Sequence, residues 1–151
     1  MRLIPLALIV ASAAFAAAPD LTGSWKLNLT KSDFGQFPPP SSMSAKVTHA
    51  DPKLTVALKM ASENGDLDLS SNYTTDGKEC VNQGFGGSDT KTVATWQGET
   101  LHMQTKGAFG DVAYTMTDKW TLSADGKILT IQRNFSSSMG EVDQKLILEK
   151  Q

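Results

Sequence analysis

From about residue 20 onwards, apolar and polar side chains alternate along almost every segment of the chain. Alternation with a period of two residues is typical of β-strands with one buried face, and no segment of helical length carries an apolar stripe with a period of 3.6 residues. Turn signals rich in Gly, Asp, Asn and Pro separate the alternating segments. The pattern predicts an all-β fold of about ten strands, at 22–29, 43–50, 53–61, 66–75, 78–83, 90–97, 100–106, 112–123, 127–135 and 141–149.

Four dipeptides between these strands have the composition of two-residue hairpin turns: Asn64-Gly65, Asp76-Gly77, Gly98-Glu99 and Asp125-Gly126. Asp125-Gly126 predicts a type I′ turn, which needs positive φ at both central residues. Such turns also predict which residues face each other across the hairpins. The expected pairs are Met60 with Leu69, Tyr73 with Cys80, Trp96 with Leu101, Ala94 with Met103, Trp120 with Ile131, Leu122 with Leu129 and Met116 with Phe135. Weaker turn signals add Val47 with Val56, Met103 with Tyr114 and Ile131 with Leu146.

Hairpins that follow one another along the chain form an up-and-down meander. A meander of this many strands with one apolar face ordinarily curls until its edges meet, because a closed barrel removes exposed strand edges. We therefore expect an up-and-down antiparallel meander of about 8–10 strands, closed into a single barrel domain over residues 17–151.

The first sixteen residues have the composition of a secretory signal peptide. Arg2 supplies the positive start, residues 3–10 are apolar, and Ala14 and Ala16 precede the expected cut. We expect cleavage between Ala16 and Ala17 and export to the bacterial periplasm or the medium; the alternative is an uncleaved anchor. The apolar stretch is shorter than the ~20 residues that a spanning helix needs, which favours cleavage. No later segment is apolar enough to span a membrane.

Composition and motifs exclude several classes of function. The 14 Lys and Arg residues against 16 Asp and Glu residues give a net charge of −2 without a basic run, which argues against nucleic acid as a partner. The lone Cys80 cannot form an internal disulfide, and it is not expected to be a nucleophile because no base lies beside it. His49 and His102 fall on opposite faces, so no metal site is expected. No catalytic motif and no cofactor motif is present, and the oligomeric state is left open.

The start of the first strand, Gly23-Ser24-Trp25-Lys26-Leu27, resembles the glycine-x-tryptophan start shared by lipocalins, fatty-acid-binding proteins and avidins, the calycin group of barrels. The following Lys31-Ser32-Asp33-Phe34 is similar to a stretch in exported bacterial proteins with a lipocalin-like domain. The resemblance implies a barrel that binds small apolar or amphiphilic molecules, with Trp25 closing one end under a basic side chain from a late strand. Unlike secreted lipocalins, the chain lacks their disulfide. Three prolines in the linker 30–42 forbid the paired helices of fatty-acid-binding proteins.

Arg133 is the most informative polar residue on the predicted inner face. The expected registers place Asp118 opposite it on one side and Gln144 on the other. One hypothesis is a satisfied internal ion pair, with Arg133 stacked on Trp25 or Trp120. The other is that Arg133 receives an anionic head group such as a carboxylate and that Asp118 orients it. A β-bulge near Asp118 would turn its carboxylate outward and weaken both hypotheses.

Other inward side chains are candidates for contact with a ligand. Methionine adapts to varied apolar ligands but fills irregular gaps in a solid core equally well, so both interpretations stay open. Ser71, Tyr73, Cys80 and Asn82 beside the Gly-rich loop 84–87 line either a hydrated rim or a portal. The complete set of predicted ligand-binding residues is Trp25, Tyr73, Trp96, Met103, Tyr114, Met116, Asp118, Trp120, Arg133 and Gln144.

Three functions fit these observations. The first is an exported protein that binds or carries a small hydrophobic or amphiphilic molecule, carboxylated if Arg133 receives an anionic head group. The second is a filled barrel that acts through its surface as an envelope-associated or partner-binding module. The third, for which no catalytic residue is identified, is a small-molecule isomerase or cyclase. An internal cavity larger than ~300 Å³ beside Arg133 would favour the first or the third.

Overall fold

All ten predicted strands are present in the computed structural model, which describes residues 17–151; the predicted signal peptide at 1–16 lies outside the described residues. Observed boundaries differ from the predicted ones by at most three residues, chiefly where turns trim or extend a strand. The strands are β1 (Gly23–Leu27), β2 (Ser42–Ala50), β3 (Lys53–Ala61), β4 (Leu67–Thr74), β5 (Cys80–Gln83), β6 (Asp89–Gln97), β7 (Thr100–Phe109), β8 (Val112–Leu122), β9 (Ile128–Ser137) and β10 (Gly140–Lys150).

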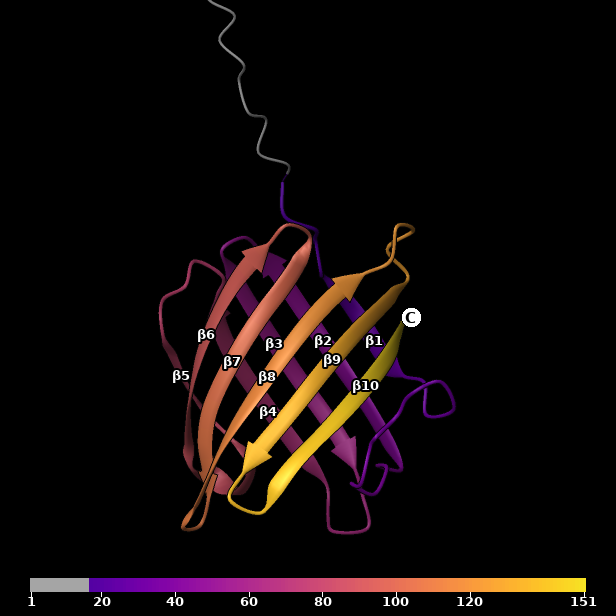
Figure 1. Cartoon of the computed structure of the whole chain (residues 1–151). Coiled ribbons are helices and arrows are strands. Elements are labelled where there is room, and N and C mark those ends of the chain that lie inside the picture. Colours follow the sequence, from indigo (N-terminus) through magenta and orange to yellow (C-terminus); the bar gives the residue numbers. More distant parts are fainter. Residues whose placement is uncertain (1–16) are drawn as a thin grey trace, which may run out of the picture.

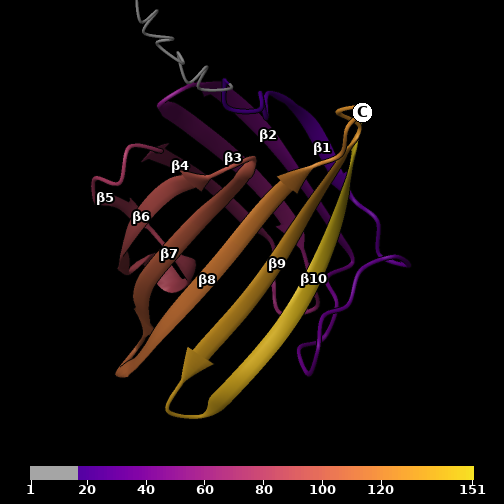
Figure 2. The same cartoon turned by 45° about the horizontal axis from the view of Figure 1, so that its top comes forward.

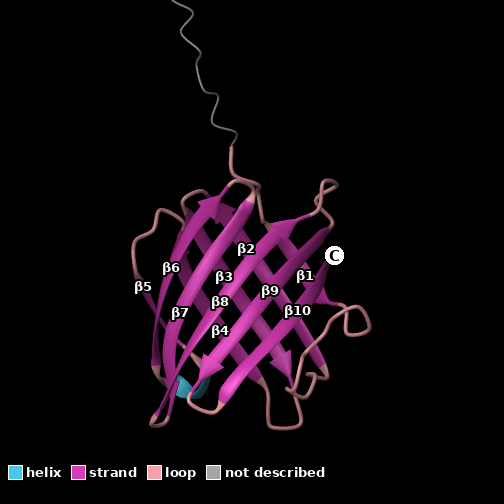
Figure 3. Ribbon diagram, viewed as in Figure 1, coloured by secondary structure: helices cyan, strands magenta, loops and turns pink. Residues whose placement is uncertain are grey.

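The strands form one antiparallel sheet in the order β4-β3-β2-β1-β10-β9-β8-β7-β6-β5. Because β1 pairs with β10, the two ends of the meander meet and the sheet curls into a nearly closed barrel. In Figure 1, β6–β10 lie in front of β1–β4 and cross them at a steep angle, and Figure 2 shows the sheet curving around its interior. The helix in Figure 3 is the short 3₁₀ turn η1, Phe85–Gly87. No helix within residues 17–151 is long and apolar enough to cross a membrane.

Most of the predicted strand registers are confirmed. Among the confirmed pairs are Trp120 with Ile131, Val47 with Val56 and Ile131 with Leu146. The turn at Asp125-Gly126 is not type I′, because Asp125 does not have positive φ. The amide of Gly126 instead donates to the carbonyl of Ser123, which closes the turn one residue earlier and leaves the strand register unchanged.

Two predicted registers are wrong by an even number of residues. Met60 faces Leu67 rather than Leu69, because residues 62–66 form a five-residue loop instead of a two-residue turn. Tyr114 faces Gly107 rather than Met103, because β7 and β8 both extend to a tight turn at 110–111. Even shifts keep the same side chains inside, so the alternating pattern could not distinguish these registers.

The predicted hairpin between β4 and β5 does not form, and Tyr73 does not pair with Cys80. Cys80 pairs with Thr92 of β6 instead. The gap between β4 and β5 is bridged by one carboxamide: Asn82 Oδ1 accepts from the Asn72 amide at 2.8 Å, and Asn82 Nδ2 donates to the Asn72 carbonyl at 3.0 Å. This side chain takes the place of a neighbouring strand for one residue of the β4 edge.

The barrel is solidly packed at the end where the chain enters. Trp25 is almost fully buried there, and its indole Nε1 donates to the carbonyl of Leu21 at 3.0 Å. Lys150 of β10 places its ammonium 5.7 Å from the centre of the Trp25 ring, as the resemblance implied for a basic side chain from a late strand. We call this half, at the top of Figure 1, the closed end. Its core includes Leu21, Trp25, Val47, Leu54, Leu101, Leu129 and Leu148.

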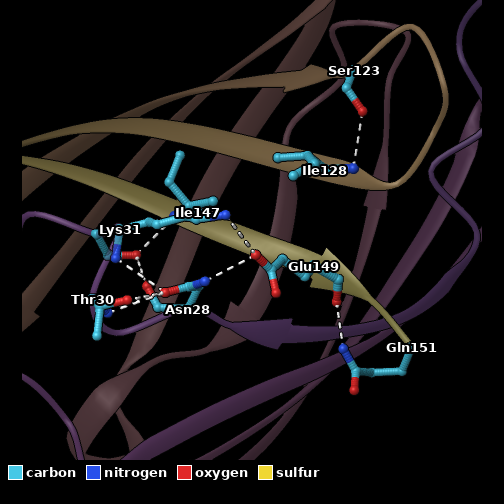
Figure 4. A network of polar contacts seen from close by, with 9 residues as sticks. Asn28, Thr30, Lys31, Ser123, Ile128, Ile147, Glu149 and Gln151 are labelled. Atoms are coloured by element: carbon cyan, nitrogen blue, oxygen red, sulfur yellow. Dashed lines mark hydrogen bonds and ion pairs between the residues drawn. The ribbon is translucent and has the colours of Figure 1, made fainter.

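The segment after β1 folds without a helix and is fastened to β10. The Asn28 side-chain oxygen accepts hydrogen bonds from the backbone amides of Thr30 and Lys31, and its side-chain nitrogen donates to Glu149 (Figure 4). Local Asn bonds of this kind end a strand and turn the chain. Ser32 continues the attachment, because its hydroxyl accepts from the Ile147 amide. The following residues, 33–41, therefore run along the end of the barrel opposite to Trp25.

Candidate functional site

A cavity of about 590 Å³ opens at the end of the barrel opposite to the closed end. It continues inward into a smaller space of about 150 Å³, and Met116, Tyr114 and Arg133 line both spaces. We call this half, at the bottom of Figure 1, the open end. The larger volume lies within the range of about 300–1,000 Å³ that is typical of small-molecule sites.

Aromatic rings form a continuous series of contacts around the opening. Phe37 meets Phe135 edge-on at 5.5 Å, Phe135 stacks on Tyr114 at 5.0 Å, and Tyr114 stacks on Phe109 at 4.8 Å between ring centres. Phe109 in turn lies 6.3 Å from Phe85. These residues come from five separate segments, so the rim closes only when the barrel is folded.

Part of this rim is exposed. Phe37 of the Pro-rich segment is 40% exposed, Phe109 at the end of β7 is 44% exposed, and Met139 in the β9–β10 turn is 84% exposed. Exposed apolar side chains beside an apolar cavity mark a surface that an apolar molecule can contact on entry. The rim and the cavity are therefore continuous.

Arg133 and Asp118 meet at the inner limit of the cavity, as their predicted register requires. The guanidinium donates from Nε to Oδ1 and from Nη2 to Oδ2, each at 2.8 Å. The Asp118 side chain is 6% exposed and the Arg133 side chain 21%. Burial opposes the charge on Arg133, but its attraction to Asp118 and the two hydrogen bonds outweigh burial and raise the pKa of the guanidinium. The Asp118 side chain points into the barrel, so the β-bulge that would have turned its carboxylate outward does not occur.

The pair leaves part of the guanidinium available to a ligand. A guanidinium has five N–H donors, and Asp118 takes two of them. None of the hydrogen bonds among residues 17–151 uses the other three. Gln144 lies next to Arg133 in register, as predicted, but its amide donates to the carbonyl of Phe34 at 3.2 Å.

Two tyrosines accompany Arg133 in the cavity wall. Burial raises the pKa of Tyr73, although a hydrogen bond with Ser71 acts in the opposite direction. Burial likewise raises the pKa of Tyr114, although the positive charge of Arg133 favours the ionised form and acts in the opposite direction. Both hydroxyls therefore remain protonated at neutral pH and can donate or accept a hydrogen bond.

Gly107 positions Tyr114. The two residues face each other across β7 and β8. A Cβ on Gly107 would lie 2.5 Å from the Tyr114 hydroxyl oxygen and 2.6 Å from Cζ. The absence of a side chain on Gly107 therefore allows the Tyr114 ring to lie across β7 in the wall of the cavity.

Seven of the ten predicted ligand-binding residues line the two connected spaces, whereas the three tryptophans do not. Trp25 belongs to the packed closed end. Trp120 Nε1 contacts Asp118 at 3.5 Å, and Trp96 Nε1 donates to Asp51 at 3.0 Å. The seven that line the spaces are Tyr73, Met103, Tyr114, Met116, Asp118, Arg133 and Gln144.

A polar network surrounds Asp51 at the closed end. Asp51 accepts from the Thr75 hydroxyl at 2.6 Å and from Trp96, and His49 Nε2 lies 3.2 Å from the same oxygen. The bond from Thr75 is the main cause of the lowered pKa of Asp51. His49 Nδ1 accepts from the Leu21 amide, which places the ring proton on Nε2. The residues described contain no group of three or more possible metal ligands.

Several cavity residues are not among the predicted ligand-binding residues, although the loop that carries Phe85 was expected beside a rim or portal. Phe34, Phe37, Phe85 and Phe109 lie in loops or at strand ends, where alternation carries no information. Their only signal in the sequence is the presence of aromatic side chains in segments rich in Pro or Gly, which pack poorly unless the fold supplies a partner surface.

Comparison with known proteins establishes the type of barrel. No protein-family model and no curated protein matches the sequence. A zebrafish ileal bile acid-binding protein, crystallised with cholic acid, is similar in structure with a TM-score of 0.61 at 14% identity, over 87% of this chain and 98% of that one. Secretory abundant heat soluble protein 4 from Ramazzottius varieornatus gives 0.61 at 15% identity, over 91% and 99%. A Drosophila melanogaster brain fatty-acid-binding protein gives 0.54 at 18% identity, over 85% and 98%. The chain therefore has the fold of a calycin-type β-barrel.

Proposed function

We propose that this calycin-type barrel is an exported, non-catalytic protein that binds or carries a small amphiphilic molecule. The apolar part of the ligand occupies the open end, and its polar head reaches Arg133. The observation that carries the proposal is the cavity of about 590 Å³ that leads from an aromatic rim to a guanidinium with unused donors. Two of the similar structures are named as a bile acid-binding protein and a fatty-acid-binding protein, which supports a small amphiphile as the ligand class.

The cavity also argues against the two alternative functions, a filled barrel that acts through its surface and an isomerase or cyclase. A barrel that acts only through its surface has no need of an apolar space next to its internal ion pair. An isomerase or cyclase needs a group that moves a proton or attacks the ligand, and Asp118 is engaged by Arg133 through both carboxylate oxygens. Simple binding therefore accounts for the geometry best.

Nile red, an uncharged dye whose fluorescence rises in apolar surroundings, tests the binding function. We expect it to bind the purified protein, and Met116→Trp to weaken binding at least tenfold, about 1.4 kcal/mol, because the larger ring fills the middle of the cavity. Val93→Trp is the matched control, since Val93 lies outside on β6. Absence of Nile red binding, together with native mass spectra that show no co-purifying ligand, would overturn the proposal.

Export is a separate part of the proposal. It is supported by the charged, apolar and small-residue pattern of residues 1–16. Cell fractionation combined with N-terminal sequencing tests it: we expect a periplasmic or secreted product that starts at Ala17. A product that retains Met1 or stays in the cytoplasm would contradict export and leave the binding function unaffected.

A further inference from the structure

The wall of the cavity contains one positive and one negative charge, and the two compensate each other. Among the described residues that line it, only Arg133 and Asp118 belong to the Asp, Glu, Lys and Arg types. They are joined by two hydrogen bonds of 2.8 Å, and Asp118 is almost fully buried. The positive charge that a carboxylate ligand would require is therefore already matched by the protein itself.

The entrance to the cavity is not basic either. The segments that surround the open end, 34–41, 62–66, 84–88, 110–111 and 138–139, contain no Lys or Arg. They contain three exposed carboxylates, Glu63, Asp66 and Asp111. A negatively charged ligand would approach against this field, since an entrance of one charge sign raises the local concentration of ligands of the opposite sign.

The polar groups that remain free suit an uncharged oxygen atom. Three N–H donors of Arg133 are free of hydrogen bonds among the described residues, and the hydroxyls of Tyr73 and Tyr114 belong to the same cavity wall. A ligand hydroxyl or carbonyl can accept these hydrogen bonds without adding charge. A ligand carboxylate would bring a second negative charge next to buried Asp118, and like charges in a poorly hydrated site repel strongly. A ligand ammonium would be repelled by the positive charge of Arg133.

We propose that the ligand has an uncharged, oxygen-bearing head group, such as an alcohol, aldehyde, ester or amide, and that Asp118 excludes carboxylates by compensating Arg133. This proposal rests on the proposed binding function and revises the expectation that Arg133 receives a carboxylate. Asp118 is thereby assigned as the residue that determines head-group specificity.

Three ligands with the same ten-carbon chain test the proposal by displacing Nile red. They are 1-decanol, decanoate and decylammonium, measured near pH 7.5, where the last two are charged. We expect 1-decanol to displace the dye at a concentration at least tenfold lower than either charged ligand, a difference of about 1.4 kcal/mol. Equal or tighter binding of decanoate or decylammonium would overturn the proposal while the binding function stands.

Asp118→Asn tests the role of the carboxylate itself. The substitution keeps the shape of the side chain and removes its charge, so we expect decanoate to bind at least tenfold more tightly than to the unmodified protein, with 1-decanol little changed. Glu99→Gln is the matched control, because it removes an exposed carboxylate from the β6–β7 turn at the closed end, away from the cavity and its entrance. An Asp118→Asn protein that folds, by circular dichroism, and gains no affinity for decanoate would overturn the assignment. The ranking of the three ligands by the unmodified protein tests the head-group class independently of any variant. If neither the dye nor any of the three ligands binds, the binding function fails, and this proposal fails with it.

Discussion

Replacing Arg133 by Met should destabilise the protein strongly, because it leaves the Asp118 carboxylate buried without a counter-charge. Two hydrogen bonds of 2.8 Å are lost, and the remaining contact to Asp118, from Trp120, is long at 3.5 Å. Removing one partner of a buried ion pair typically costs about 3–5 kcal/mol. A domain whose stability lies well above the lower end of the usual range of about 5–15 kcal/mol would remain folded in water but with a reduced margin.

Urea denaturation followed by tryptophan fluorescence measures this loss. With a slope of about 2 kcal/mol per M, the midpoint of Arg133→Met should fall by about 2 M. The double variant Asp118→Leu, Arg133→Met removes both charges and should lie within about 1 kcal/mol of the unmodified protein, because apolar replacement of a whole buried pair is often neutral.

Lys119→Met is the matched control for this experiment. Lys119 follows Asp118 on β8 and is exposed on the outer face, so its loss should change stability by no more than about 0.5 kcal/mol. A cost below about 1 kcal/mol for Arg133→Met, or losses that simply add in the double variant, would refute the argument that the pair is buried and coupled.

Three further predictions concern other parts of the barrel. Asn82→Ala removes both bonds to the Asn72 backbone and should cost about 1–2 kcal/mol, with faster hydrogen exchange at the Asn72 amide in NMR spectra. Gly107→Ala should force the Tyr114 ring to move, at a cost of about 1–3 kcal/mol, and should weaken Nile red binding in fluorescence titrations. The pKa of Asp51 is lowered in the folded protein, so its contribution to stability is present at neutral pH and lost as the pH falls below about 4. The melting temperature of Asp51→Asn should therefore depend less on pH in that range than the melting temperature of the unmodified protein.

The sequence predicted the strands because each one has a buried and an exposed face, and the physical signal repeats every two residues. The same signal repeats for every even shift of register, which explains why the β3–β4 and β7–β8 hairpins were misplaced by two and four residues. Only the length of the connecting loop selects among even shifts, and the five-residue loop at 62–66 has no feature that excludes a shorter turn at Asn64-Gly65.

The candidate site was predicted only in part, and its two halves explain why. Asp118 and Arg133 lie within regular strands on either side of a hairpin whose register was correctly predicted, so their contact followed from that register. The rim comes from loops brought together by closure of the barrel, and no local pattern relates Phe37 to Phe109. The gap between β4 and β5 could not be predicted either. In the sequence, Asn82 occupies an inward position of the alternating pattern like any strand residue, and nothing indicates that its side chain binds the backbone of Asn72.

The division between a packed end and an open end follows from how a barrel is stabilised. Its walls are held by backbone hydrogen bonds along each strand pair, and these bonds do not require that the space inside be filled. Apolar packing at the closed end, where Leu54, Leu101 and Leu129 are almost fully buried, can then anchor strands that continue into the open end. In a chain with one cysteine, and so without an internal disulfide, this packing carries the stability. The side chains at the open end are thereby released from core packing, and methionine and phenylalanine side chains there can contact a ligand.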